Sequence, residues 1–570
     1  TLVVTATRTP TPVRELLNDI SVITQEDIQR AGQTTLPELL RSLPGIEFSA
    51  NGGAGTNSSV FIRGANANHT LVLIDGMRIN SATTGTTALE KIPLGQIEHI
   101  EVLRGPGSHL YGSEAIGGVI QIFTKSGGAA PGFHLGGGAG SRGLYQVNAG
   151  GNGKLGGVNF NLEIAHESTD SFSAIGDTTS STYNPDNDPY RNTSASAKLS
   201  HRLNDQHEFG ATGFYSNGKG HFDGSRTYDS RNNQTLAAYG FYSQDRFLPD
   251  WKSQIRIGRS FDDLRSLTST SWTKFRTDQE QLSWQNDLET GVGRFTLGTE
   301  HNRQHVTSTT SYTVSKRAVH SYFAGYQGRF GAHSTQLNVR NDDNSQFGSH
   351  ATGSAAYGYQ FTKAWRANAS IGTAFRAPTF NELYFPNYGI STLRPERAVN
   401  KEAGVHFDHA AQHVSLVYFD NQISDLINSG TVVSQTQRAS ITGATLSYHG
   451  RVDNFNLRAS ATAQNPRNET NNLLLNRRAK QTATAGIDYQ SGAWSYGGEL
   501  NASGKRYDDA NNTKPLGGYT VFNLHSGYTY SKALSFVARL NNVFDKQYEL
   551  AKTYNTPDRN IFVGFDYHPK

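Results

Sequence analysis

The stretch Val158-Asn-Phe-Asn-Leu-Glu-Ile164 decides the fold, because apolar and polar side chains alternate strictly along it. Successive side chains of a β-strand point to opposite faces, so this pattern predicts a strand with one apolar and one polar face. The same period of two recurs from about residue 129 onward, for example in Phe522-Asn-Leu-His-Ser-Gly-Tyr-Thr-Tyr530. Turns rich in Gly, Asn, Asp and Ser separate these segments, as expected for a long series of antiparallel strands.

Two-faced strands in such number need a closed arrangement that hides their edges. We therefore expect an all-β membrane protein, a large transmembrane antiparallel barrel with apolar side chains outside and polar ones inside, which fits a mean hydropathy of −0.55. At roughly 20 residues per strand and connection, residues 129–570 hold about 22 strands. The alternative is a soluble propeller or large sandwich. A propeller would repeat a fixed blade motif, and none is visible.

The composition excludes several functions. There is no cysteine, so disulfide frameworks and thiolate chemistry are absent. The net charge is only +4 and the basic residues are scattered, which argues against nucleic acid as a partner. The sequence holds no phosphate-binding Walker motif, no HExxH zinc motif and no GxSxG nucleophile motif, so we expect no enzyme.

Residues 8–128 have a different pattern, that of a globular α/β domain. Thr24 begins a helix with a capping-box spacing to Asp27, and Gly32 is expected to end it. Thr35 can cap a second helix. The expected strands are Ser59–Arg63, Thr70–Ile74, His99–Leu103 and Gly118–Phe123. Because an open barrel of 22 strands would leak solutes, we expect this domain to fill the lumen as a plug.

The first seven residues, Thr1-Leu-Val-Val-Thr-Ala-Thr7, form a short uncharged β-prone segment, and Arg8, Pro10 and Pro12 follow it. A free strand at a terminus can be captured by a partner with an open sheet edge. The alternative is an ordinary or frayed first strand that binds no partner. Since the chain opens directly on this segment, we also expect that an export signal has been removed.

Motifs along the whole chain resemble those of the TonB-dependent outer-membrane transporters. Residues Thr1, Leu2, Val3, Val4, Thr5 and Ala6 resemble the TonB box, which implies that TonB binds them. The plug motifs are Phe61-Ile-Arg-Gly64, Leu73-Ile-Asp-Gly-Met-Arg78, Ile100-Glu-Val-Leu-Arg-Gly-Pro106 and Leu110-Tyr-Gly-Ser-Glu-Ala-Ile-Gly-Gly118. The barrel motifs are Ala374-Phe-Arg-Ala-Pro378, Glu382-Leu-Tyr384, Leu393-Arg-Pro-Glu396 and Leu540-Asn-Asn-Val-Phe-Asp545. The resemblance implies a TonB box at 1–7, a plug at 8–128, a barrel at 129–570 and a monomer in the outer membrane of a Gram-negative bacterium.

Within the family, the chain is most similar to the branch that transports cobalamin (vitamin B12) and related corrinoids. The stretches that carry this likeness are Asn51-Gly-Gly-Ala-Gly55, Ser58-Ser59, Asn66-Ala-Asn-His69, Arg340–Gly348 and Arg477-Arg-Ala-Lys480. That branch uses plug loops as ligand contacts. The corresponding residues here are Thr56, Asn57, Ser58, Thr83, Thr84 and Thr86. Small polar side chains suit a ligand rich in amides, although ordinary exposed turns would have the same composition.

Five aspartates, Asp170, Asp186, Asp188, Asp223 and Asp229, lie in two loop-like stretches. If the loops touch, mutual repulsion favours binding of a hard cation, and calcium accepts such oxygen ligands in flexible geometry. The alternative is a set of solvated acidic turns. The resemblance implies calcium-ordered extracellular loops, and Asp177 is a possible substitute ligand because the first loop is longer than the family pattern.

Two other functions remain open from the sequence. One is transport of a ferric siderophore on the same fold, although the plug loops lack the Arg and Tyr residues expected for an anionic chelate. The other is a passive porin or adhesin, in which the N-terminal strand is only structural. The resemblance also implies a surface that phages or colicins can use as a receptor.

Overall fold

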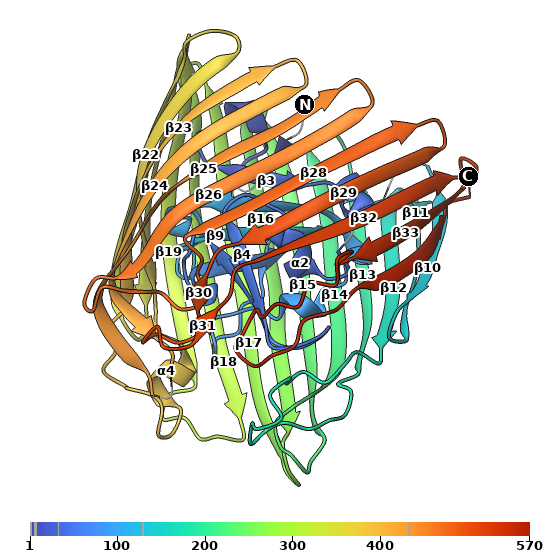
Figure 1. Cartoon of the computed structure of the whole chain (residues 1–570). Helices are drawn as coiled ribbons and strands as arrows, with labels where there is room; N and C mark the ends of the chain where they lie inside the picture. Colours follow the sequence, from blue (N-terminus) through green and yellow to red (C-terminus); the bar gives the residue numbers. More distant parts are fainter. Residues whose placement is uncertain (1–2, 5–7, 32, 128–129, 431, 570) are drawn as a thin grey trace.

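The computed structural model describes residues 3–4, 8–31, 33–127, 130–430 and 432–569. The chain folds into a closed antiparallel barrel that surrounds a smaller N-terminal domain (Figure 1). In the described residues no helix has the length and apolar character needed to cross a membrane. The expected boundary at 128/129 lies outside the described residues; the last plug strand ends at Thr124 and the first barrel strand begins at Gly132.

The barrel strands follow one another in chain order, and β10 pairs with β34 to close the ring. They are β10 (Gly132–Gly140), β11 (Leu144–Leu155), β12 (Val158–Thr169), β13 (Tyr190–Arg202), β14 (His207–Phe222), β15 (Ser230–Leu248), β16 (Trp251–Leu267), β17 (Trp272–Thr290), β18 (Gly293–Ser308), β19 (Lys316–Phe330), β20 (His333–Asn344), β21 (Gly348–Gln360), β22 (Trp365–Arg376), β23 (Glu396–His409), β24 (Gln412–Asn428), β25 (Ser434–Val452), β26 (Phe455–Asn468), β27 (Leu473–Leu474), β28 (Gln481–Ser491), β29 (Trp494–Ser503), β32 (Tyr519–Thr529), β33 (Leu534–Asn541) and β34 (Asn560–Tyr567). Because β27 has two residues and β26 also pairs directly with β28, 22 strands form the wall within the described chain, which confirms the predicted number.

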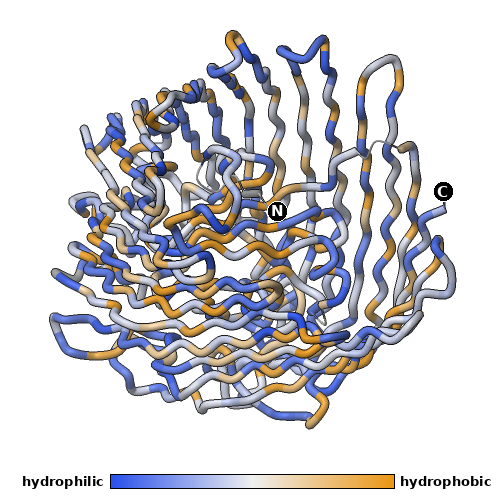
Figure 2. The backbone as a smooth tube through the Cα atoms, turned by 90° about the horizontal axis from the view of Figure 1, so that it is seen from above, coloured by the Kyte–Doolittle hydropathy of each residue, from blue (hydrophilic) through white to orange (hydrophobic). Residues whose placement is uncertain are grey.

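The alternation predicted from Val158–Ile164 is present in β12. Leu162 and Ile164 are exposed on the outer surface, whereas Asn161 and Glu163 are buried in the lumen. Figure 2 shows hydrophobic and hydrophilic positions alternating along many of the barrel strands. An apolar exterior and a polar interior are what a barrel in lipid requires.

The two rims of the barrel differ in the length of their connections. On one rim the strands are joined by turns of two to four residues, such as 156–157, 249–250 and 530–533. On the other rim most connections are longer, such as 170–189, 377–395 and 542–559. In Figure 1 the short turns lie at the top and the long loops at the bottom. Short turns face the periplasm and long loops face outward in outer-membrane barrels.

The plug contains a five-stranded mixed sheet in the order β3-β8-β9-β6-β7, a hairpin of β4 and β5, and short helices. The strands are β2 (Thr11–Pro12), β3 (Ile20–Ile23), β4 (Ile46–Ala50), β5 (Ser58–Ile62), β6 (Thr70–Ile74), β7 (Met77–Arg78), β8 (Ile97–Arg104) and β9 (Gly118–Thr124). The helices are η1 (Val13–Glu15), α1 (Gln25–Arg30), α2 (Leu36–Arg41), η2 (Ala67–His69), η3 (Leu89–Lys91), η4 (Leu94–Gln96) and α3 (Ser108–Tyr111). Both predicted helices begin where expected: Thr24 and Asp27 form a capping box, and Thr35 caps α2. Gly32 lies outside the described residues.

Buried ion pairs attach the plug to the wall. Arg63 pairs with Asp19 of the plug and with Glu402 of β23, both at 2.6 Å. Arg104 also forms an ion pair with Asp19, with Nη1 and Oδ1 3.0 Å apart. Arg63 therefore bridges the two domains. Removing one partner of a buried pair leaves an uncompensated charge, so these contacts fix the plug in the lumen.

Candidate functional site

Two plug loops reach the long-loop rim of the barrel. The first is Gly55-Thr-Asn-Ser58, the second half of the turn 51–57 between β4 and β5 together with the first residue of β5, and the second is the loop 79–88 after β7. The second loop is closed by hydrogen bonds from the amide of Ser81 to the carbonyl of Thr86, and from Gly85 to Ser81. Both loops contain a glycine in the left-handed region, Gly55 at φ +75° and Gly85 at φ +76°, which allows the tight reversal.

The six predicted ligand residues differ in exposure. Asn57 and Thr84 are exposed, whereas Ser58 and Thr86 are half-buried. Thr56 and Thr83 are buried, and their hydroxyls already bond within the plug. The contacts are Thr56 Oγ1 to the carbonyl of Gly53 at 2.8 Å, Thr83 Oγ1 with Ser81 Oγ at 2.8 Å, Ser58 Oγ to Glu90 at 2.6 Å and Thr84 Oγ1 with Thr86 Oγ1 at 3.0 Å. Asn57 and Thr84 are therefore the members best placed to meet a molecule from outside.

Three of the five predicted aspartates come together. Ligand oxygens of Asp186, Asp188 and Asp223 lie within 4.8 Å of one another. The backbone of the loop 170–189 holds them: Asp188 accepts from the amide of Ala174 at 2.7 Å, and Asp223 from the amide of Ile175 at 2.6 Å. Asp186 Oδ1 is buried without a hydrogen-bond partner in the described structure. We call Asp186, Asp188 and Asp223 the aspartate cluster.

Burial and mutual repulsion disfavour the charged form of these carboxyls. Burial, followed by the charges of Asp223, Asp186 and Asp229, raises the pKa of Asp188 to about 7. The pKa of Asp223 is also raised, mainly by burial and partly by Asp186. A cation among the three would relieve both effects, because it supplies the missing opposite charge and a partner for Asp186 Oδ1. Carboxylate oxygens at this spacing fit a hard divalent ion such as calcium.

Asp170 and Asp229 lie outside the aspartate cluster. The Asp170 side chain is exposed near Gly143, and Asp229 bonds His221 Nδ1 at 2.7 Å. Asp177 accepts bonds from the amide and hydroxyl of Thr179, at 2.9 and 2.6 Å, and so closes its own turn. Their assignment as metal ligands stays a prediction.

The loop 170–189, which we call the aspartate loop, leads into Tyr190 at the start of β13, which packs against the first plug loop. Sequence reasoning missed this contact. Tyr190, two residues after Asp188, donates its hydroxyl to the carbonyl of Glu90 at 3.2 Å. Lys91 lies over the Tyr190 ring at 4.5 Å and donates to the carbonyl of Gly55 at 2.7 Å. A β-carbon on Gly55 would collide with the Tyr190 ring. The position of the aspartate loop is thus coupled to that of the plug loop.

This contact predicts a specific effect of a small substitution. Gly55→Ala is expected to lower the opening free energy of the amides at 55–58 by about 2–3 kcal/mol, because it adds backbone strain and displaces Tyr190. Native-state hydrogen exchange measures this quantity. Gly156→Ala is the matched control, since Gly156 also has a positive φ of +56° and nothing lies within 4 Å of its added β-carbon. Equal losses at both positions would show that Tyr190 does not fix the plug loop.

The second plug loop is held by the connection between β22 and β23. This connection contains helix α4 (Phe380–Tyr384). The amides of Phe380 and Asn381 donate hydrogen bonds to the carbonyls of Ala82 and Thr83, at 3.0 and 3.2 Å. Arg376 at the end of β22 binds Glu382 and Glu396, and His69 of the plug binds Glu396 at 2.9 Å. The barrel motifs around these residues therefore position an external loop on the plug.

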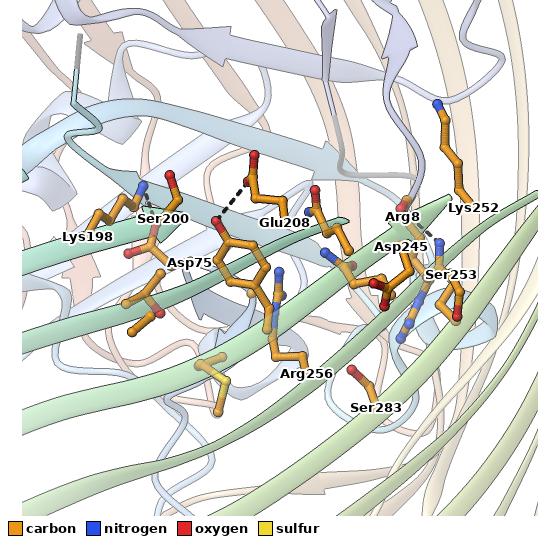
Figure 3. A pocket seen from close by; sticks show the side chains of 18 of the residues that line it. Arg8, Asp75, Lys198, Ser200, Glu208, Asp245, Lys252, Ser253, Arg256 and Ser283 are labelled. Atoms are coloured by element: carbon orange, nitrogen blue, oxygen red, sulfur yellow. Dashed lines mark hydrogen bonds and ion pairs between the residues drawn. The ribbon is translucent and has the colours of Figure 1, made fainter. Parts of the chain in front are cut away.

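A cavity of about 820 Å³ lies between plug and wall toward the short-turn rim. Figure 3 shows Lys198 of β13 against Asp75 of the plug, with Glu208, Asp245, Lys252 and Arg256 along the wall. Lys198 and Asp75 are 2.8 Å apart. The lining combines these charged side chains with apolar ones.

Arg8 and Pro10, which follow the N-terminal segment, line this cavity. Arg8 pairs with Glu300 of β18 at 2.5 Å, donates to the carbonyl of Leu110 at 2.6 Å, and lies 4.3 Å from the Phe323 ring centre. Before it, β1 (Val3–Val4) pairs with β2 in a two-stranded sheet separate from the plug sheet and the barrel. Thr1, Leu2, Thr5 and Ala6 lie outside the described residues. The segment is thus attached at Arg8, on the rim opposite the aspartate cluster.

Two family models match the chain. The model described as "TonB-dependent Receptor Plug Domain" matches residues 12–119, and "TonB dependent receptor-like, beta-barrel" matches residues 132–543. Among curated proteins, "Vitamin B12 transporter BtuB" of Photobacterium profundum is 30% identical over 586 aligned residues, which cover 99% of this chain and 95% of that protein.

Solved structures share the fold at lower identity. A mutant of the ferric enterobactin receptor PfeA from Pseudomonas aeruginosa superposes with a TM-score of 0.84 at 20% identity, over 96% of this chain and 98% of that one. The siderophore receptor PirA from Acinetobacter baumannii gives 0.83 at 19% identity, with the same coverage. At such identities the likeness concerns the fold alone.

Proposed function

Because the chain belongs to the TonB-dependent receptors, which are transporters of the Gram-negative outer membrane and not enzymes, we propose that it imports cobalamin or a related corrinoid. The single observation that carries the substrate is the 30% identity to a vitamin B12 transporter along nearly the full length of both chains. The exposed amide of Asn57 and hydroxyl of Thr84 support it, since they can exchange hydrogen bonds with the amide groups of such a ligand.

We propose further that calcium binds the aspartate cluster. Three carboxylates within 4.8 Å and a buried, unpaired oxygen on Asp186 fit a hard cation. By neutralising these charges, the ion would order the loop 170–189. That loop leads into Tyr190, whose ring lies against Gly55 of the first plug loop. An ordered rim lowers the entropy cost of binding a large ligand.

Residues 1–7 are proposed as the segment that TonB captures by strand addition. Support comes from β1, whose only described pairing is to the two-residue strand β2. Little sheet structure has to be broken before another strand can pair with it. Pulling this segment would withdraw Arg8 from Glu300 and enlarge the charged cavity beside the plug. Withdrawal of Arg8 thus links force on the N-terminus to a route for the ligand.

The first test is a titration of the purified protein in detergent with cyanocobalamin, with calcium and then with a chelator. We expect tight binding that weakens by about tenfold or more when calcium is removed, because the rim loops then lose their order. Binding of equal strength in chelator would retain the ligand and reject the metal. No binding in either condition would reject the corrinoid, and ferric siderophores would be the next probe.

A further inference from the structure

The outer surface of β16–β19 carries many ionisable side chains between its apolar band and the long-loop rim. Along β16 the outward side chains change from exposed Ile255 and Ile257 to Arg259, and along β17 from exposed Trp284 and Leu282 to Glu280. The ionisable outward positions on the four strands are Arg259, Asp263, Arg265, Lys274, Arg276, Asp278, Glu280, His301, Arg303, His305, Lys316 and His320. We call this set the basic patch.

The strand register makes the patch continuous. Glu280 of β17 is opposite both Arg259 of β16 and Arg303 of β18. His301 of β18 is opposite His320 of β19, and their rings are 4.2 Å apart. Because directly opposite residues share a face, side chains of all four strands form one surface.

Two of the three carboxylates in the patch lie beneath arginine side chains, whereas the third, Glu280, is 57% exposed and pairs with Arg303 at 3.7 Å. Arg259 and Arg265 side chains are 57% and 55% exposed, whereas their partners Asp278 and Asp263 are only 12% and 8% exposed. Arg276 lies over both acids, at 2.7 Å from Asp278 and 3.3 Å from Asp263. Asp278 and Asp263 therefore orient the guanidinium groups above them, and six basic side chains with one exposed carboxylate leave this surface positive.

The excess charge is local. The basic patch holds six Lys or Arg side chains against three carboxylates, apart from its histidines, while the whole chain of 570 residues has a net charge of only +4. Solvation alone does not require such a bias, since charges of both signs would serve equally well. A concentration of one sign on one face indicates an anionic partner.

The height of the patch identifies the kind of partner. Strands β16, β17 and β18 have 17, 19 and 16 residues, whereas about 9–11 suffice to cross a bilayer. The extra residues of these strands extend past exposed Ile257 and Leu282 toward the long-loop rim. The patch thus lies at the headgroup level of the outer leaflet.

We propose that the basic patch binds the phosphate groups of the outer-leaflet glycolipid, lipopolysaccharide. Arginine presents a planar fork of donors that matches phosphate oxygens, and basic clusters at a membrane surface attract anionic headgroups. Acyl chains of the same lipid would cover Ile257 and Leu282 below. This binding is independent of the ligand that the barrel transports.

The test compares the wild-type protein with the triple variant Arg259→Gln/Arg276→Gln/Arg303→Gln. Delipidated proteins in detergent are titrated with lipid A and with dephosphorylated lipid A, and bound lipid is counted by native mass spectrometry. The matched control is Lys154→Gln/Arg329→Gln/Arg451→Gln, which removes three exposed positive charges at the short-turn rim. We expect lipid A to bind the triple variant about tenfold or more weakly than it binds the wild type and the control.

Three results would overturn the proposal. One is equal binding of lipid A by the wild type and a folded triple variant, with folding checked by the heat-dependent shift of the barrel on gels. Another needs no variant: if wild-type protein binds dephosphorylated lipid A as tightly as lipid A, then acyl chains and not phosphates hold the lipid. Loss of binding in the control variant to the same extent would also reject the patch as the site.

Discussion

Deleting residues 1–7 is expected to abolish cyanocobalamin uptake by whole cells, with a decrease of about 100-fold or more, while the affinity of the purified protein changes less than about twofold. The reason is the separation of the two ends of the molecule. The plug loops with Asn57 and Thr84 lie at the long-loop rim, whereas Arg8, which follows the N-terminal segment, lies in the cavity toward the short-turn rim. Removing the segment leaves the ligand site intact and removes the proposed attachment point for TonB.

A point variant refines this test. Val4→Pro removes one backbone donor from β1, so strand addition should fail and uptake should fall nearly as far as in the deletion. Val4→Thr keeps the donor and is the matched control. Uptake that survives the deletion would contradict the transporter mechanism and favour a passive barrel in which the first strand is only structural.

The second large effect is expected at the aspartate cluster. Asp188→Asn should lower the affinity for cyanocobalamin in calcium by about tenfold or more, because the ion loses a charged ligand and no longer orders the rim. In chelator the same substitution should instead stabilise the loop 170–189. This loop should exchange hydrogen more slowly than in the wild type, since an amide removes the repulsion while it still accepts from Ala174.

The sign of the chelator effect follows from the pKa of Asp188. Folding raises this pKa to about 7, above that of the unfolded chain near 4. The ionised group therefore costs stability at pH values above about 4, reaching its full cost above pH 7, and the substitution removes that cost. Asp229→Asn is the matched control, because Asp229 lies outside the aspartate cluster and pairs with His221. An equal loss of calcium response in Asp229→Asn would show that the metal site is wider than three carboxylates.

Sequence reasoning was strongest where local chemistry determines structure. The alternation in Val158–Ile164 predicted β12 and its two faces because the period of a strand is a property of neighbouring residues. Thr24 and Asp27 predicted the start of α1 for the same reason, since a capping box spans four residues.

Long-range packing could not be predicted in this way. The sequence places five aspartates in two loops, but only the register of β13 and β14 brings Asp186 and Asp188 to Asp223 while Asp170 remains outside the group. The contacts of Tyr190 with Glu90 and Lys91 join positions about 100 residues apart, and no local pattern marks them. Such contacts depend on the circumference of the closed barrel and on how the plug lies inside it.

The pairing of β10 with β34 has a consequence for the biogenesis of the protein. The wall cannot be sealed until the chain has been synthesised through Tyr567, because Leu135 pairs with that residue. Unpaired strand edges are not tolerated in hydrocarbon, so insertion into the bilayer and sealing of this seam must be concerted. The plug is made first and ends up enclosed, with Arg63 bound to Glu402 more than halfway along the chain. The barrel can therefore close around the plug only after the last strand, β34, is available to pair with β10.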